Sequence, residues 1–167
     1  GEDEQAIACY AVAEEIARDL GDTRRLAFTL AKRGAMHHRR GETDESIACF
    51  TEAEQIGELA GDPRLVARNR CQRGRVYLEL GELDKAWKAL RSGLDVYEEM
   101  NASQSIFCFG YMCDLVRIAR ERCDHPTALA LARKALDLAD QLRLDEEHPD
   151  ETTREGVALV RAIVEAG

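Results

Sequence analysis

The sequence predicts an all-α protein built from a tandem series of antiparallel helix pairs. The first observation is an internal repeat: residues 1–40 and 41–80 carry the same residue at 14 of 40 positions, aligned without a gap. The second is the composition, which has only 5% aromatic residues, three prolines and few β-branched residues, and therefore disfavours strands. Residues 81–122 form a looser third copy, and a fourth begins at Cys123 after an insertion of two residues.

Each copy contains two helices separated by a turn signal. In residues 43–60 apolar and small residues recur at helical spacing. The segment AGDP then ends this helix, and Asp62 and Pro63 are the predicted N-cap and first-turn residues of the next one. The same reading along the chain predicts helices at about 3–20, 23–40, 43–60, 63–80, 83–100, 103–121, 126–143 and 151–165.

Two glycines recur at the same places in successive copies. Gly34 and Gly74 fall in the middle of predicted helices, where glycine costs about 1 kcal/mol relative to alanine. A repeated unfavourable choice indicates a structural rule, so we expect the partner helix to cross closely there. Gly41 and Gly81 follow the last helical residue, where a left-handed backbone conformation is easiest for glycine.

This pattern resembles the tetratricopeptide repeat. In both places the mid-helix glycine is followed, one helix later, by bulky Phe50 or Leu90, with the small residue Ala53 or Gly93 three positions further on. The resemblance covers essentially the whole chain. The usual period is about 34 residues, so the chain is similar to the longer, forty-residue variety found in bacterial regulators and scaffold proteins.

The sequence also departs from the family pattern. Leucine usually precedes the mid-helix glycine, but Arg33 and Arg73 stand there, and Val116 replaces the glycine itself in a later copy. HEAT-type helix pairs have a similar period, but they do not need this arrangement of glycine and alanine. The resemblance therefore implies a right-handed superhelical solenoid of about eight helices.

We expect a single solenoid over residues 1–167. It would comprise the second helix of an incomplete repeat at 1–22, helix-pair repeats at 23–62, 63–102 and 103–145, and a C-terminal capping helix at 150–167. The acidic segment 143–151 is the one expected break. The incomplete first repeat suggests a segment of a longer regulatory or scaffold protein, and the Ala/Arg-rich composition is typical of high-GC bacteria.

The net charge is −9, but basic residues are concentrated on the first helix of each pair and acidic residues on the rest of the chain. The first helices of the pairs (23–40, 63–80 and 103–122) hold 14 basic and three acidic residues, which gives +11, whereas the rest of the chain carries −20. In the tetratricopeptide family the first helices line the concave face of the solenoid. The resemblance therefore implies a basic groove inside an acidic shell.

The expected groove residues lie on these first helices. They are Lys32, His38, Arg39, Arg68, Gln72, Arg75, Arg117 and Arg120. Arginine suits a carboxylate-bearing ligand because its planar fork pairs with carboxylates through two hydrogen bonds. The alternative is that basic first helices only neutralise acidic second helices, through exposed pairs worth about 0–1 kcal/mol each. The carboxylate clamp of chaperone-binding members is not expected, because Ala31 and Ala35 occupy the places of its lysine and asparagine.

Chemistry-bearing motifs are sparse. His37 and His38 point about 100° apart on a helix, and no cysteine or carboxylate lies three or four residues from them on that helix. The six cysteines follow no disulfide or metal-site spacing, and Cys9 and Cys49 are expected in the core, as are Phe107, Phe109 and Tyr111. We expect no catalytic residue, no metal, no cofactor and no essential disulfide.

The sequence therefore predicts a non-catalytic module of a cytoplasmic protein, and its expected ligand is an acidic peptide or partner helix. Self-association through the helix of the incomplete first repeat is the alternative function. Nucleic acid is not an expected partner, because the chain is acidic and the groove has few aromatic residues. No apolar run approaches the roughly 18 residues of a membrane span.

Overall fold

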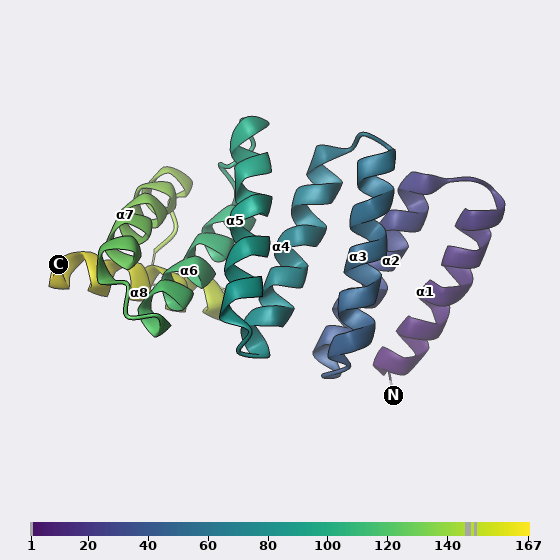
Figure 1. Cartoon of the computed structure of the whole chain (residues 1–167), viewed down its shortest axis with the longest axis horizontal. Coiled ribbons are helices and arrows are strands. Elements are labelled where there is room, and N and C mark those ends of the chain that lie inside the picture. The colour runs from purple at the N-terminus through teal and green to yellow at the C-terminus, as the bar shows by residue number, and fades with distance from the viewer. Residues whose placement is uncertain (1, 146–147, 149) are drawn as a thin grey trace. The chain divides into compact units, whose positions relative to one another are not determined.

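The computed structural model describes residues 2–145, 148 and 150–167, and this part of the chain folds into eight α-helices without a strand. The helices are α1 (Glu2–Asp19), α2 (Thr23–Arg39), α3 (Thr43–Leu59), α4 (Pro63–Glu79), α5 (Leu83–Glu99), α6 (Ile106–Glu121), α7 (His125–Leu142) and α8 (Glu151–Ala166) (Figure 1). The predicted all-α repeat of antiparallel helix pairs is confirmed. The acidic break expected at 143–151 includes residues 146, 147 and 149, which lie outside the described residues.

Side-chain caps mark several helix starts, although α3 begins after Glu42 without one. Asp62 accepts a hydrogen bond from the Leu65 amide at 3.0 Å and Pro63 occupies the first turn, as predicted. Ser105 has an extended backbone, and its hydroxyl accepts from the Cys108 amide at 3.2 Å. This cap explains why α6 begins at Ile106, three residues later than the sequence predicts.

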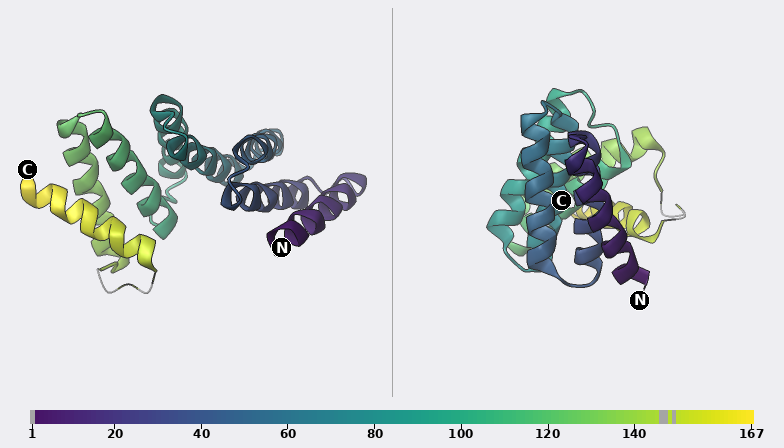
Figure 2. Two further views of the ribbon diagram at one scale, coloured as in Figure 1. Left: turned by 90° about the horizontal axis from the view of Figure 1, so that it is seen from below. Right: turned by 90° about the vertical axis from the view of Figure 1, so that its right-hand side faces the viewer.

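The chain divides into two compact units, Gly1–Val96 and Tyr97–Gly167. In the first unit α2 packs against both α1 and α3, α4 packs against α3, and α2 also contacts α4. In the second unit α8 lies beside both α6 and α7 (Figures 1 and 2). The boundaries 23–62, 63–102 and 103–145 of the repeats, and the capping role of 150–167, stay predictions.

A left-handed residue ends seven successive helices at intervals of about twenty residues. Gly41 and Gly81 have φ values of +74° and +71°, as predicted, and Cys123 takes the same conformation in a later copy, with φ +56°. The full set is Gly21, Gly41, Gly61, Gly81, Asn101, Cys123 and Arg143. This residue reverses the chain so that each helix returns antiparallel to the previous one.

The mid-helix glycines stand where helices cross closely, which confirms their predicted role. A Cβ atom on Gly34 would lie 3.1 Å from Cys49 Cβ, and one on Gly74 would lie 2.8 Å from Leu90 Cγ. The approach from the other helix of this crossing is closer still, because a Cβ atom on Gly93 of α5 would lie 2.3 Å from Cys71 Sγ of α4. Contacts between real Cβ atoms and other heavy atoms are almost never shorter than 3.0 Å. Each of these glycines therefore sets the distance between two helices.

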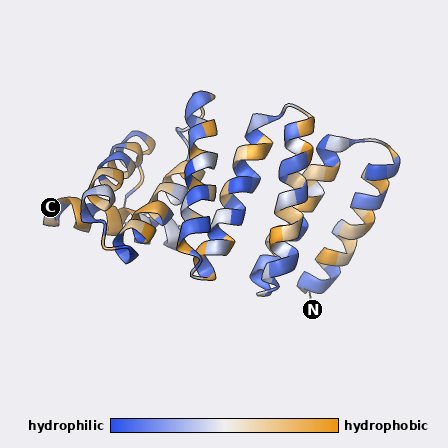
Figure 3. Cartoon of the chain, in the orientation of Figure 1, coloured by the Kyte–Doolittle hydropathy of each residue, from blue (hydrophilic) through white to orange (hydrophobic). Residues whose placement is uncertain are grey.

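The core consists of aliphatic, alanine and aromatic side chains from every helix, and Figure 3 shows hydrophobic and hydrophilic residues alternating along the helices. Phe109 and Tyr111 are buried as predicted, but Phe107 is 66% exposed. Phe107 lies in the first turn of α6, whose next two residues, Cys108 and Phe109, are buried, so Phe107 stands on the exposed side of that turn. The prediction for Phe107 is therefore wrong.

The cysteines divide in the same way. Cys49 is buried against Gly34 of α2, as predicted, whereas Cys9 on α1 is exposed. In the first unit α1 packs against α2, and Cys9 lies on a side of α1 that this contact leaves exposed. The prediction that Cys9 lies in the core is therefore wrong.

Replacing Gly74 by leucine should lower the free energy of unfolding by about 2–4 kcal/mol, because the new side chain overpacks the crossing with Leu90. Gly110 of α6 is the matched control, since a Cβ there would meet no atom within 4 Å. Gly110→Ala should raise stability by about 0.5–1 kcal/mol through helix propensity alone. Thermal unfolding followed by circular dichroism measures both, and an unchanged melting temperature for Gly74→Leu would contradict the packing role.

Candidate functional site

The basic residues predicted for the groove occupy one face of α2 and one face of α4 in the first unit. On α4, Arg68, Gln72, Arg75 and Glu79 follow one another at spacings of three or four residues, which aligns them along one side of the helix. Phe28, Lys32 and Arg39 stand forty residues before Arg68, Gln72 and Glu79 on α2. We call this surface the α2–α4 face and define it by Phe28, Lys32, Arg39, Arg68, Gln72 and Arg75.

A hydrogen bond between the two helices joins the two halves of this surface. His38 Nε2 on α2 lies 2.7 Å from Glu79 Oε2 on α4. An ionised carboxylate can only accept, so the His38 ring donates through Nε2. The one acidic residue in the α4 stripe is therefore occupied by a partner on α2, and His38 serves as a bridge between the helices.

Two cations of the α2–α4 face have no carboxylate partner among the described residues. Arg68 is exposed and forms no ion pair there. Lys32 contacts only an aromatic ring, since its Nζ lies 5.4 Å from the centroid of Phe28. Arg39 differs, because its guanidinium pairs with Asp3 of α1. The surface thus combines fixed positive charge with a half-exposed aromatic side chain, because Phe28 is 50% exposed.

Basic residues on the other sides of α2 and α4 are paired with acids of the neighbouring helices. Arg33 Nη1 lies 2.7 Å from Glu14 Oε2, and Arg73 Nη1 lies 2.8 Å from Glu54 Oε2. The two pairs stand forty residues apart, and both carboxylates are buried, with Glu14 3% and Glu54 7% exposed. These arginines therefore neutralise acids of the neighbouring helices, through pairs that are largely buried rather than exposed as the alternative interpretation expected.

This repeated pair accounts for the departure from the family pattern. Arginine in place of the usual leucine before the mid-helix glycine requires a buried acid opposite it, and the preceding helix supplies Glu14 or Glu54. In the next copy the two equivalent places hold Leu94 and Leu115, which are both buried. The glutamate and the arginine are therefore both present in two successive copies, and both are replaced by leucine in the next copy.

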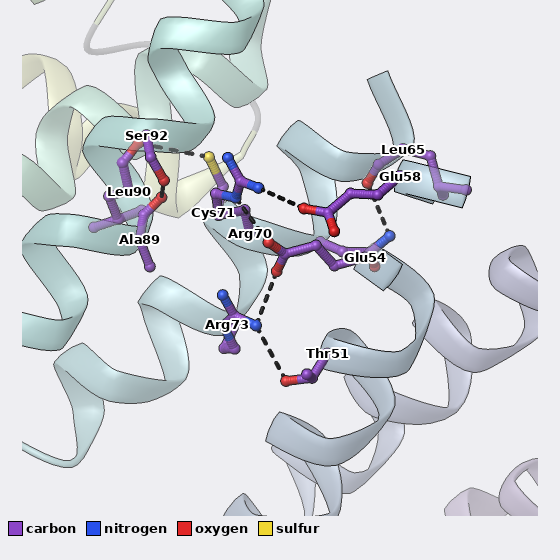
Figure 4. Close-up of polar contacts among 11 residues, drawn as sticks. Thr51, Glu54, Glu58, Leu65, Arg70, Cys71, Arg73, Ala89, Leu90 and Ser92 are labelled. Carbon is purple, nitrogen blue, oxygen red and sulfur yellow. Dashed lines mark hydrogen bonds and ion pairs between the residues drawn. The ribbon is translucent and has the colours of Figure 1, made fainter. Parts of the chain in front are cut away.

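Figure 4 shows how the second pair is extended. Glu54 also accepts a hydrogen bond from Arg70 Nε at 2.8 Å, and Arg70 Nη2 reaches Glu58 at 3.1 Å. Arg73 Nη1 donates to the Thr51 hydroxyl at 3.1 Å. The cations of α4 thus divide into a group held by α3 and a group on the α2–α4 face.

Burial raises the pKa of Glu14, and the neighbouring Arg33 guanidinium only opposes that shift. A carboxyl whose pKa is higher in the folded state contributes stability in its protonated form, and this contribution is lost as the pH rises through the folded pKa. Ionisation of Glu14 therefore does not by itself add net stability to the fold. Its partner Arg33 is what makes the buried charge tolerable.

Arg117 and Arg120 of α6 belong to the second unit and are described there. Arg117 Nη1 lies 3.5 Å from Oδ1 of the buried Asp114. Arg120 is exposed and lines a mainly apolar hollow with Leu129 of α7 and Ile163 of α8. Participation of these two arginines in the same groove as Arg68 stays a prediction.

Comparison with solved structures identifies several helical-repeat proteins of the same fold. The chain superposes with a TM-score of 0.80 on BtubC (BKLC) from P. vanneervenii, at 18% identity over 99% of this chain and 70% of that one. RapI in its apo form gives a TM-score of 0.80 at 16% identity, over 99% of this chain and 63% of RapI. A putative kinesin light chain of Podosopora anserina with nearly identical TPR-like repeats gives 0.73 at 13% identity, over 99% and 81% of the two chains.

The fold defines a helical-repeat module of a kind that generally mediates protein–protein interactions and is typically non-catalytic. More particularly, residues 25–99 match the tetratricopeptide repeat family, which confirms the resemblance predicted from the sequence. Comparison with curated protein sequences gives no match.

Two further properties concern cofactors and membranes. Within the described ranges, no group of three or more His, Cys, Asp or Glu side chains is arranged to hold a metal ion. No helix in the described part of the chain combines the length and the apolar character that a membrane crossing needs.

Phe28 is the surface residue that the sequence prediction missed. Its repeat equivalent is Arg68, so it lacks a counterpart of the same type, and an isolated aromatic residue in a helix is ordinarily assigned to the core. The sequence contains one indication that Phe28 belongs to this surface. It stands four residues before Lys32, which places both side chains on one side of the helix.

The Glu14–Arg33 pair should behave as a unit in a double-mutant cycle. Glu14→Leu and Arg33→Leu should each cost about 3 kcal/mol, because each leaves an unpaired charge in a largely buried place. The double variant should lie within about 1 kcal/mol of the wild type, since leucines pack at both equivalent places one copy later. Urea unfolding measures the three values, and additive losses would contradict the proposed coupling.

Proposed function

We propose that the chain is a non-catalytic interaction module whose α2–α4 face binds an acidic segment of a protein partner. One observation carries this proposal. Lys32 and Arg68 lack carboxylate partners among the described residues, whereas Arg33, Arg70 and Arg73 on the other sides of the same helices are paired. Cations needed only for neutralisation would each lie beside a carboxylate, as these three arginines do.

The chemistry of the face suits a carboxylate-bearing segment with an apolar residue beside it. Arg68 can present two parallel N–H donors to one carboxylate, and Lys32 supplies a compact positive charge. Gln72, the repeat counterpart of Lys32, follows Arg68 by one turn on α4 and can donate an amide N–H or accept from the ligand backbone. The exposed ring of Phe28 offers apolar contact area at a low cost in conformational entropy.

The net charge of −9 makes this local arrangement important. An acidic ligand is repelled by the chain as a whole, but that repulsion is screened beyond about 8 Å at physiological ionic strength. Close to the α2–α4 face the cations Lys32 and Arg68 dominate. They therefore orient an acidic segment on this face and disfavour the rest of the surface.

Several finer features belong to the same proposal. Arg75 extends the stripe on α4. The partner is a protein rather than a nucleic acid. The module acts within a larger regulatory or scaffold protein in the reducing cytoplasm, where its cysteines remain thiols.

Selection from a phage-displayed random peptide library tests the proposal even though the natural partner is unidentified. Peptides enriched on the wild-type chain should be rich in Asp and Glu, and the Lys32→Glu/Arg68→Glu variant should lose them. Each lost charge-assisted hydrogen bond is worth about 1.5–3 kcal/mol, so affinity should fall at least tenfold per cation. Fluorescence anisotropy with one selected peptide measures the change.

Arg133→Glu/Lys134→Glu is the matched control, since it makes the same change of charge at two exposed positions of α7. It should leave binding unchanged, and circular dichroism should show all three proteins folded. Enrichment of basic or neutral peptides would contradict the proposal, as would equal losses of affinity in the two double variants.

Self-association through α1 is a second candidate, and an exposed apolar stripe favours it. Val12 is 56% and Ile16 is 52% exposed, and the two stand four residues apart on α1 together with the exposed Cys9. Sedimentation velocity should then show an oligomer for the wild type and a smaller species for Val12→Gln/Ile16→Gln. Identical sedimentation of the two proteins would rule this candidate out.

A further inference from the structure

A hollow of about 450 Å³ opens in the first unit on the side of α4 that faces away from the α2–α4 face. Arg73 stands two residues before Arg75 on α4, which turns their side chains about 160° apart. The walls come from three helices, and the charged and aromatic side chains among them are Glu54, Arg70, Arg73, Tyr77, Lys85 and Lys88.

The acids near the hollow are already engaged. Both oxygens of Glu54 are held, one by Arg70 and one by Arg73, each at 2.8 Å (Figure 4). Glu58 lies 3.1 Å from Arg70, and Lys85 Nζ at the rim lies 2.7 Å from Glu82 Oε2. These carboxylates and the cations they hold therefore form a neutral lining.

Two polar groups of the residues that line the hollow have no partner among the described residues. Lys88 is exposed and forms no ion pair among the described residues. Arg73 Nε is buried and has no hydrogen-bond partner in that part of the chain. Four cations stand against the three carboxylates Glu54, Glu58 and Glu82, which leaves one net positive charge at the hollow.

The preceding repeat shows that the fold itself does not require these cations. Arg73 has its counterpart in Arg33, but the other three cations have none. The places forty residues earlier hold Leu30 for Arg70, Glu45 for Lys85 and Ala48 for Lys88. The helix crossings are the same in both repeats, so the positive charge is specific to this hollow.

We propose that this hollow binds a small molecule carrying one anionic oxygen group, a phosphate or a carboxylate. Lys88 contacts the anion, and Arg73 Nε donates a hydrogen bond to it from the floor. The ring of Tyr77, which Lys85 Nζ approaches to 5.4 Å from its centroid, and the methyl group of Ala89 give an apolar part of the ligand a surface to pack on. The site is separate from the α2–α4 face and does not depend on the function proposed for it.

The lysines make this site directly observable, because the chain has only four of them: Lys32, Lys85, Lys88 and Lys134. Reductive methylation with ¹³C-labelled formaldehyde keeps their charge and gives each an NMR signal. Phenyl phosphate and benzoate are the two probes. The signals of Lys85 and Lys88 should shift saturably with at least one probe, while that of Lys134 on α7 should stay in place.

Lys88→Ala provides the variant, since it places at this position the alanine that the preceding repeat already has. It should weaken binding by about tenfold or more, read from the Lys85 signal, because one charge-assisted contact is lost. Binding of phenyl phosphate alone would assign a phosphorylated ligand, and binding of benzoate as well would assign a carboxylate-bearing one. Equal small shifts of all four lysines, no shift, or unchanged affinity in Lys88→Ala would overturn the proposal.

Discussion

The close approach of paired helices at glycine is the constraint on which the first unit depends. Where α4 crosses α5, Gly74 and Gly93 leave room for Leu90 and Cys71, and Gly34 does the same for Cys49 where α2 meets α3. Because close-packed interiors transmit small displacements, a side chain at any of these crossings would shift a whole helix. Because the pattern repeats every forty residues, equivalent residues of successive repeats lie on the same face of their helices. The repeated pattern therefore forms a surface.

The same repeat places the arginines that are paired with acids and those that are not on different faces of their helices. Arg33 and Arg73 face the preceding helix and meet a buried glutamate there, whereas Arg68 faces the other way and meets none among the described residues. A buried ion pair gives little net stability, since desolvation offsets the attraction. The paired replacement of Glu–Arg by Leu94 and Leu115 agrees with this. The pairs therefore act mainly to fix which helix face meets which, and Arg68 remains available for recognition.

The sequence predicts most of the fold because its strongest signals are local. Helix ends follow from glycines at twenty-residue intervals and from Asp caps, and the crossings follow from glycine in mid-helix. What it could not predict depends on neighbours. Arg33 looked like a departure from the family, since nothing local reveals that Glu14 lies opposite it. Cys9 and Phe107 carry the residue types of core positions, but their exposure depends on which helices cover them.

Modification by phenylglyoxal, which reacts with accessible guanidinium groups, tests the division between structural and available cations most directly. Peptide mass spectrometry can follow each arginine separately in the unliganded protein. Arg68 should react rapidly, whereas Arg33 and Arg73, whose side chains are only 25% and 20% exposed and are held by glutamates, should react much more slowly. Similar rates at all three positions would contradict the division, because they would show that the arginines facing the neighbouring helices are no more engaged than those of the α2–α4 face.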